Sequence, residues 1–279
     1  MIPPVASRFV AGESPPVAID HARRLNADGV KVILNLLGEH YRDREPADAD
    51  ADAYRRLLRD LEGSGVDACV SVKPSQVGLD VDEAVFRENL RSIVDAADAR
   101  DRFAWVDMED ASTTDATLDA VADLAEEFPD AIGVCVQANL RRTRADLERL
   151  APLPLKVRLV KGAYDEPESV AYTRKAHVNE AYREDLAYMF EAFDDGVAVG
   201  SHDPAMIDLA RDLHEEHGTP FEVQMLMGVR EDAQRELAAE GYDVWQYAPY
   251  GEKWFSYFYR RVRERKENLA FALRAVAGV

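Results

Sequence analysis

Short apolar segments of this sequence repeatedly end in a charged or polar side chain. Two cations, Arg158 and Lys161, lie within the segment VRLVKG, where Gly162 follows them. Other apolar segments close on a residue able to exchange protons or hydrogen bonds, namely Lys73, Asp107, Gln137, His202, Gln224 and Tyr247. Any one of them is ordinary at a strand end, where side chains meet water. Together they predict a polar, mainly cationic ligand site on a chain whose net charge is −19.

The elements that must position these side chains follow from the alternation of apolar and amphipathic segments. Candidate strands cover residues 31–38, 68–73, 103–108, 132–137, 155–162, 197–202, 221–226 and 242–247. Helical spacing of apolar residues covers 52–65, 83–99, 116–128, 180–196, 204–218 and 230–241. Such alternation is typical of βα units and a parallel sheet. Eight units fit a (β/α)8 TIM-like barrel, typically of about 250 residues, better than an open doubly wound sheet.

We therefore expect an α/β barrel that forms one domain over residues 1–279, with a short N-terminal lead at 1–29. Catalytic groups of such barrels lie at the C-terminal ends of the strands and in the loops that follow. Arg158 and Lys161 have opposite parity along their strand. Either a bulge or the start of the loop must therefore bring both side chains to the same end of the barrel.

The composition excludes several classes of function. Acidic residues outnumber basic ones by 53 to 34, which opposes binding to nucleic acid or to an anionic membrane. The excess of Asp and Glu, with Arg preferred over Lys, favours a salt-loving source, because salt screens self-repulsion. An ordinary acidic cytosolic protein is the alternative. Signal-peptide and transmembrane patterns are lacking, so we expect a cytoplasmic chain, and Cys69 and Cys135 are expected in the core.

Familiar short motifs do not explain the polar strand ends. GSGVDA at 63–68 matches a dinucleotide pattern but ends a helix instead of opening one, so we interpret it as a cap and turn. The histidines and cysteines lack metal-ligand spacing, and no metal is expected. Tyr257, Arg260 and Arg261 share one face of a predicted helix at 254–269, where the arginines could bind a carboxylate and Glu264 could hold them. An ordinary basic helix face explains the same spacing.

Seven ordered motifs resemble the proline dehydrogenase family, from RFVAGES near residue 8 to the C-terminus. They are LLGE (36–39), SVKPSQVGLD (71–80), VDMED (106–110), VRLVKGAY (157–164), GSHDP (200–204), FEVQMLMG (221–228) and APYGEKWFSYFYRRVRERKENL (248–269). The resemblance implies FAD held at the C-terminal ends of barrel strands. It also implies oxidation of L-proline to Δ1-pyrroline-5-carboxylate by hydride transfer to flavin N5, with electrons passed to a quinone. A functional link to pyrroline-5-carboxylate dehydrogenase, and contact with the inner face of the cell membrane, would follow.

Roles for individual residues are carried over by position. The resemblance implies an ion pair between Lys73 and Asp107 near the substrate. The proline ring would pack against Tyr164, Leu226 and Tyr257, and its carboxylate would bind Arg260 and Arg261. The implied catalytic residues are Lys73, Asp107, Arg158 and Tyr164, with Arg158 near flavin N5. The implied FAD contacts are Asp107, Gln137, Arg158, Lys161, Gly162, Ala163, Lys175, Ser201, His202, Asp203 and Gln224.

Three positions depart from the family pattern, and two other functions stay open. Ser201 replaces a threonine, Asn139 replaces a tyrosine, and Asp165 follows Tyr164 where many members carry tryptophan. The same scaffold could instead support a Schiff-base lyase that uses Lys73 or Lys161 as its amine. A non-catalytic binder of imino acids or flavin is the third hypothesis. Cations at the strand ends suit FAD, because reduced flavin and the pyrophosphate are both anionic.

Overall fold

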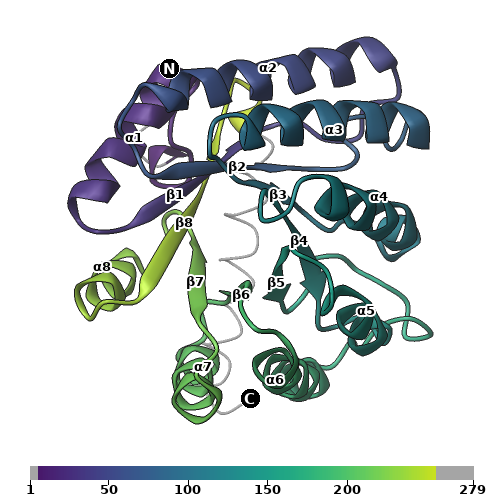
Figure 1. Cartoon of the computed structure of the whole chain (residues 1–279), viewed down its shortest axis with the longest axis vertical. Helices are drawn as coiled ribbons and strands as arrows, with labels where there is room; N and C mark the ends of the chain where they lie inside the picture. Colours follow the sequence, from purple (N-terminus) through teal and green to yellow (C-terminus); the bar gives the residue numbers. More distant parts are fainter. Residues whose placement is uncertain (1–5, 256–279) are drawn as a thin grey trace, which may run out of the picture.

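Eight parallel strands close into a barrel in sequence order, as Figure 1 shows from one end. The computed structural model describes residues 6–255. The strands are β1 (Lys31–Leu36), β2 (Ala68–Val72), β3 (Ala104–Val106), β4 (Ile132–Gln137), β5 (Lys156–Val160), β6 (Val197–Gly200), β7 (Phe221–Leu226) and β8 (Asp243–Tyr250). All eight predicted strands are confirmed. Strand β8 runs to Tyr250 and pairs with β1 along its length, which closes the barrel.

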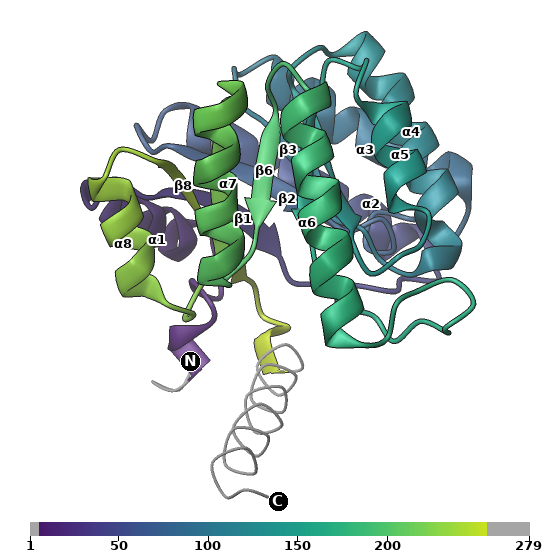
Figure 2. The ribbon, with the colours of Figure 1, turned by 90° about the horizontal axis from the view of Figure 1, so that it is seen from below.

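Helices surround the strands on the outside of the barrel (Figures 1 and 2). They are α1 (Pro15–Ala27), α2 (Arg44–Glu62), α3 (Glu83–Asp98), α4 (Thr114–Glu127), α5 (Thr143–Leu150), α6 (Lys175–Ala192), α7 (Pro204–His217) and α8 (Glu231–Ala239), with short 3-10 helices at Ala6–Arg8 and Ala111–Thr113. Helix α1 lies within the predicted lead and α5 was not expected. Helix α1 begins with two prolines after Ser14 and buries Ala18, Ile19, Ala22 and Leu25 at helical spacing.

The core has an outer and an inner part. The large outer part fills the space between helices and strands, and a small inner cluster lies within the barrel. Ile33, Cys69, Trp105, Ala198 and Trp245 make up the inner cluster. Both cysteines are buried, as predicted. In the described part of the chain, no helix combines the length and the apolar character that crossing a bilayer requires.

The positions of Arg158 and Lys161 answer the question of parity. Strand β5 ends at Val160, so Arg158 lies within the strand and Lys161 begins the loop. The start of the loop, and not a bulge, therefore brings Lys161 to the C-terminal end of the barrel, which we call the mouth. In Figure 2 the arrow of β6 points to this end, where the long loop between β5 and α6 also lies. Gly162 takes φ +109° there, a value that favours glycine.

Candidate active site

A cavity of about 340 Å³ opens at the mouth and collects most of the candidate residues. Its lining includes Lys73, Asp107, Gln137, Arg158, Lys161, Gly162, Ala163, Tyr164, His202, Gln224 and Leu226. Tyr247, one of the predicted polar strand ends, lines it too. Six further lining residues had no predicted role: Asn35, Met108, Cys135, Val160, Gly200 and Met225. The cavity wall does not include Lys175, Ser201 or Asp203. Tyr257, Arg260 and Arg261 lie outside the described residues.

Asp107 and Arg158 form the polar centre of the cavity. The guanidinium of Arg158 donates to Asp107 Oδ1, and Ser71 Oγ donates to the same oxygen over 2.7 Å. Tyr247 OH donates to Asp107 Oδ2 over 2.6 Å. Burial and the neighbouring Asp107 carboxylate raise the pKa of Tyr247, so its phenol stays a donor. Sequence reasoning marked Tyr247 as a polar strand end but missed its bond to Asp107.

The aromatic rings beside Arg158 restrict its position further. Its guanidinium carbon lies 5.0 Å from the centre of the Trp105 ring and 5.7 Å from that of Tyr247. The residue as a whole is 4% exposed. Burial costs this cation its hydration, but the carboxylate of Asp107 and the two rings offset part of that cost and leave the side chain few alternative positions. Arg158 therefore presents a fixed positive charge to the cavity.

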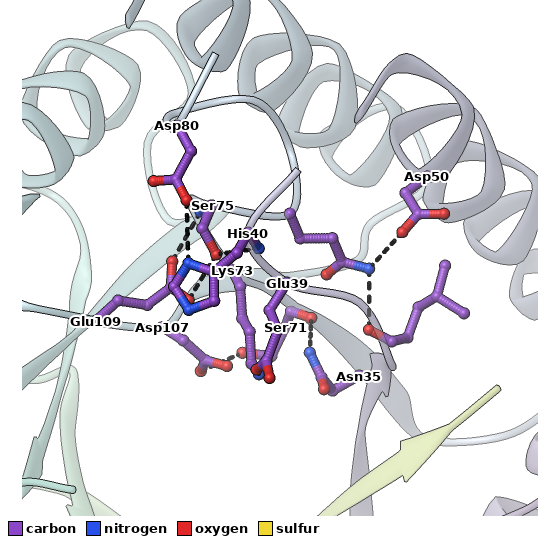
Figure 3. Close-up of polar contacts among 12 residues, drawn as sticks. Asn35, Glu39, His40, Asp50, Ser71, Lys73, Ser75, Asp80, Asp107 and Glu109 are labelled. Atoms are coloured by element: carbon purple, nitrogen blue, oxygen red, sulfur yellow. Dashed lines mark hydrogen bonds and ion pairs between the residues drawn. The ribbon is translucent and has the colours of Figure 1, made fainter. Parts of the chain in front are cut away.

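Lys73 does not form the expected ion pair with Asp107. Its ammonium donates to Glu39 Oε2 over 2.7 Å (Figure 3). Asp107 is instead occupied by Arg158, Ser71 and Tyr247. Glu39 belongs to the loop after β1, and Lys73 follows β2. The LLGE motif had drawn attention to this segment, but no role was assigned to Glu39. The expected pairing fails because Arg158 reaches across the barrel interior to the carboxylate of Asp107.

Hydrogen bonds among the loops after β1, β2 and β3 hold Glu39 and Lys73 in place (Figure 3). His40 Nδ1 lies 3.0 Å from Asp80 Oδ2, and the His40 backbone N–H donates to Ser75 Oγ over 3.1 Å. Ser75 donates both its N–H (2.7 Å) and its hydroxyl (2.8 Å) to the carboxylate of Glu109. Burial raises the pKa of Glu109, although the bonds from Ser75 oppose the shift. The three loops thus form one connected frame.

The loop after β5 contributes a second cation. Lys161 Nζ pairs with Asp203 Oδ2 at 2.7 Å, and this hydrogen bond lowers the pKa of Asp203. Asp203 also caps α7 by accepting from the N–H of Ala205. Lys161 is therefore linked to the N-terminus of α7, although Asp203 itself is outside the cavity wall. The Ala163 N–H donates to Gln137 Oε1 over 3.3 Å, so Gln137 supports the same loop from β4.

Gly162 is required by its surroundings as well as by its backbone angle. A Cβ atom at this position would lie 2.1 Å from Asn139 Oδ1, a contact that no side chain tolerates. Asn139 is one of the departures noted in the sequence, and its Oδ1 is buried without a hydrogen-bond partner among the described residues. The small asparagine and the glycine together bring the backbone of residues 161–163 close to the cavity.

The charges of the cavity suit an anionic cofactor such as FAD. Lys73, Arg158 and Lys161 line it, and Asp107 is the sole acidic lining residue within 6–255. Since Arg158 pairs with Asp107, the net charge of the wall is positive on a strongly acidic protein. The volume lies in the range of small-molecule sites, about 300–1,000 Å³. Gln137 and Gln224 add amide groups that can orient a bound ring system.

Comparison with known proteins assigns the chain to a family. A family model described as proline dehydrogenase matches residues 18–274. Proline dehydrogenase 1 of Bacillus subtilis subsp. natto is 35% identical over 274 residues, covering 97% of this chain and 90% of the relative. Proline dehydrogenase of Deinococcus radiodurans is 38% identical over 279 residues, covering 98% and 90%.

A solved structure agrees with the sequence comparisons. Proline utilization A (PutA) from Bdellovibrio bacteriovorus, inactivated by N-propargylglycine, has a TM-score of 0.84 and 25% identity, and the match covers 92% of this chain. This chain spans only 32% of the PutA chain. Fold, motifs and relatives therefore agree that the chain belongs to the proline dehydrogenase family.

Proposed function

We propose that this enzyme oxidises L-proline to Δ1-pyrroline-5-carboxylate with FAD bound at the mouth of the barrel. The observation that carries the proposal is the fixed cation of Arg158, which faces a cavity whose one carboxylate is already neutralised. Bound FAD would supply the hydride acceptor at N5, so that loss of hydride from proline C5 leaves the C=N bond of the product. Proline is favoured over other substrates because the family match and the sequence motifs both concern proline.

One group of the described side chains would bind and orient the cofactor. Arg158 would stabilise negative charge that develops on the flavin, and Asp107 with Tyr247 would hold Arg158 in place. Lys161 and the backbone at Gly162 and Ala163 would contact the cofactor, with Gln137, Lys175, Ser201, His202, Asp203 and Gln224 as further contacts. These assignments rest on the resemblance and on the positive charge of the wall.

The substrate would occupy the side of the cavity nearest Lys73. Lys73 would contact proline while Glu39 holds its ammonium, and Tyr164 and Leu226 would pack against the ring. Burial raises the pKa of Tyr164, so its phenol is neutral and can serve as an apolar surface with a polar tip. Tyr257, Arg260 and Arg261, outside the described residues, would complete the ring contact and bind the carboxylate. Binding energy at the carboxylate would orient C5.

The Schiff-base lyase is less favoured by the local contacts. A Schiff-base lysine must act as a neutral amine. Lys73 is held as the cationic partner of Glu39, and Lys161 as that of Asp203, each at 2.7 Å. Each Nζ is thus engaged by a carboxylate, so neither amine is free to attack a carbonyl carbon. A non-catalytic binder would hold the same ligands, so only a measurement of turnover distinguishes it from an enzyme.

We further infer a quinone as the electron acceptor and a cytoplasmic enzyme that meets it at the inner face of the membrane. A functional link to pyrroline-5-carboxylate dehydrogenase is proposed on the same basis, because the unstable imine product must be passed on. The similarity to a segment of the much longer PutA chain supports this link. Oxidation assays with a soluble quinone in place of oxygen would test the acceptor directly.

The deciding experiment is an absorbance spectrum of the purified protein, before and after L-proline is added without oxygen. We expect flavin bands that bleach with proline. Flavin that does not bleach would contradict proline as substrate, and a protein that stays colourless after reconstitution with FAD would contradict the cofactor.

Arg260→Ala should retain flavin but raise the proline KM by more than about tenfold, the value of one charge-assisted hydrogen bond.

A further inference from the structure

A chain of hydrogen bonds, partly buried at its first member and fully buried beyond it, crosses the barrel from its N-terminal end to the cavity. Lys156 Nζ donates to Glu222 Oε2 over 2.7 Å, at the end of the barrel opposite the mouth. Gln224 Nε2 then donates to Glu222 Oε1 over 2.5 Å. Arg158 Nη1 in turn donates to Gln224 Oε1 over 3.0 Å. Arg158 and Gln224 line the cavity, whereas Lys156 and Glu222 do not.

Glu222 determines which way the amide of Gln224 faces. An amide has a donor end and an acceptor end, whereas an ionised carboxylate only accepts. The NH2 of Gln224 must therefore face Glu222, which leaves its carbonyl oxygen toward the guanidinium of Arg158. With the amide reversed, its NH2 would face a cation that only donates. The orientation of the Gln224 amide is thus determined by Glu222, on the side away from the mouth.

Because Glu222 and Gln224 are buried, the series of hydrogen bonds is sensitive to the loss of any one member. Glu222 and Gln224 are each 4% exposed, and both come from β7 within the closed barrel. The inner apolar cluster, which includes Cys69, Trp105 and Trp245, lies within the same barrel. Burial alone would lower the pKa of Lys156, but attraction to Glu222 and the hydrogen bond to it raise the pKa, so Lys156 stays cationic. In the barrel interior, a polar group that loses its partner cannot be rehydrated easily, so its loss is costly.

We propose that Glu222 is a positioning residue that fixes the amide of Gln224 and thereby the guanidinium that Arg158 presents to the flavin. The inference rests on the proposed FAD site but goes beyond it, because Glu222 does not itself line the cavity and was not predicted to contact a ligand. Arg158 would keep Asp107 as a partner without Glu222, yet it would lose its second fixed acceptor. A less constrained cation stabilises the reduced flavin less well.

The sign of the change in flavin reduction potential separates positioning from charge. Glu222→Gln removes a negative charge, which by charge alone favours the anionic reduced flavin and raises the potential. If position dominates, the potential falls instead. The ammonium of Lys156 would donate to the carbonyl oxygen of the new glutamine side chain, so that its NH2 faces Gln224. The amide of Gln224 would then have to turn its oxygen toward residue 222 and its NH2 toward Arg158. A second variant, Lys156→Met with Glu222→Leu, removes the acceptor without changing the net charge and replaces a buried ion pair by apolar side chains, which proteins often tolerate.

Asp243→Asn provides the matched control. Asp243 is the cross-strand neighbour of Glu222 on β8, and it pairs with Lys31 at 3.1 Å instead of bonding to Gln224. The variant therefore loses the same charge at the same level of the barrel, but it leaves intact the series of hydrogen bonds that leads to Arg158. Its potential should stay level or rise, as loss of charge alone predicts, and its turnover should match that of the wild-type protein.

The experiment is a spectroscopic redox titration of the flavin in all four proteins, with steady-state kinetics on proline. Both Glu222 variants should be about tenfold harder to reduce, about 30 mV for a two-electron couple, and kcat should fall while the proline KM stays within about twofold. A raised potential in Glu222→Gln, or an unchanged one in the double variant, would overturn the inference alone. A wild-type protein without flavin would overturn the proposed function as well.

Discussion

Arg158 and Asp107 form an ion pair in the barrel interior, although β4 separates β5 from β3 in the sheet. The side chains of the pair are 5% and 15% exposed. Because the two residues satisfy each other across the interior, Asp107 is not available to Lys73. The pair therefore determines both the charge presented to the cavity and the partner that Lys73 finds in Glu39.

Substitution of Asp107 by Asn should be strongly destabilising. It leaves the Arg158 cation buried with no charged partner, a loss of about 3–5 kcal/mol in the free energy of unfolding. Tyr247→Phe removes only one hydrogen bond to the same carboxylate and should cost about 1 kcal/mol. Urea denaturation of both variants measures the two values. Equal losses would contradict the view that the charge of Asp107, and not its hydrogen bond with Tyr247, is what matters.

Lys73 and Glu39 should contribute unequally to turnover. Lys73→Met removes the cation itself and should lower kcat/KM for proline by about 10- to 100-fold, the range of a charge-assisted hydrogen bond. Glu39→Gln leaves the ammonium in place and removes only its partner, so the loss should be smaller. Steady-state kinetics on both variants decides the order. A larger loss in Glu39→Gln would mean that the carboxylate itself has the greater role.

Replacement of Gly162 by Ala should destabilise the protein for two separable reasons. The residue has φ +109°, and its new Cβ would meet Asn139 Oδ1 at 2.1 Å. We expect a loss of about 1–3 kcal/mol from strain of this kind. Adding Asn139→Ala relieves the contact but not the backbone angle, so recovery should be partial. Gly63→Ala, where φ is −95° and no atom lies within 4 Å, is the control that should be nearly neutral.

His21 should make stability depend on pH at the acid side of neutrality. Its Nε2 lies 2.8 Å from Gln246 Oε1, and burial lowers its pKa below the ordinary 6.5. The unfolded chain then binds a proton more readily than the folded one, so stability is lost as pH falls from 6.5 toward the lowered pKa. His21→Gln can still hydrogen-bond but does not titrate. Denaturation across this window should show a shallower slope in the variant, and identical slopes would contradict the assignment.

Salt should stabilise this protein if its net charge of −19 outweighs its surface ion pairs. Pairs such as Arg44 with Glu88, at 2.7 Å, are exposed and weaken as salt screens them. Self-repulsion of the acidic surface is screened as well, which acts in the opposite direction. We expect the Tm to rise between about 0.1 M and about 2 M KCl. A falling Tm would contradict the interpretation of a salt-loving source.

The eight strands could be predicted because each is a short apolar segment bounded by turns and separated by helical periodicity. The same pattern predicted which strand ends would meet at the mouth, since all C-terminal ends of a parallel barrel face one way. Helix α1 was missed because its buried residues are few and half of them are alanine, which gives a weak periodic signal. Helix α5 is eight residues long, too short for its period to stand out.

The sequence by itself determined the elements, their order and the set of side chains that gather at the mouth, because these depend on local periodicity and on the handedness of βα units. Only the tertiary structure decided the pairings within that set. Asp107 bonds to Arg158 and Tyr247, Lys73 to Glu39, and Glu222 to Lys156 because barrel closure brings residues far apart in the sequence within reach of one another. No spacing along the chain encodes which of several nearby carboxylates a buried cation will meet.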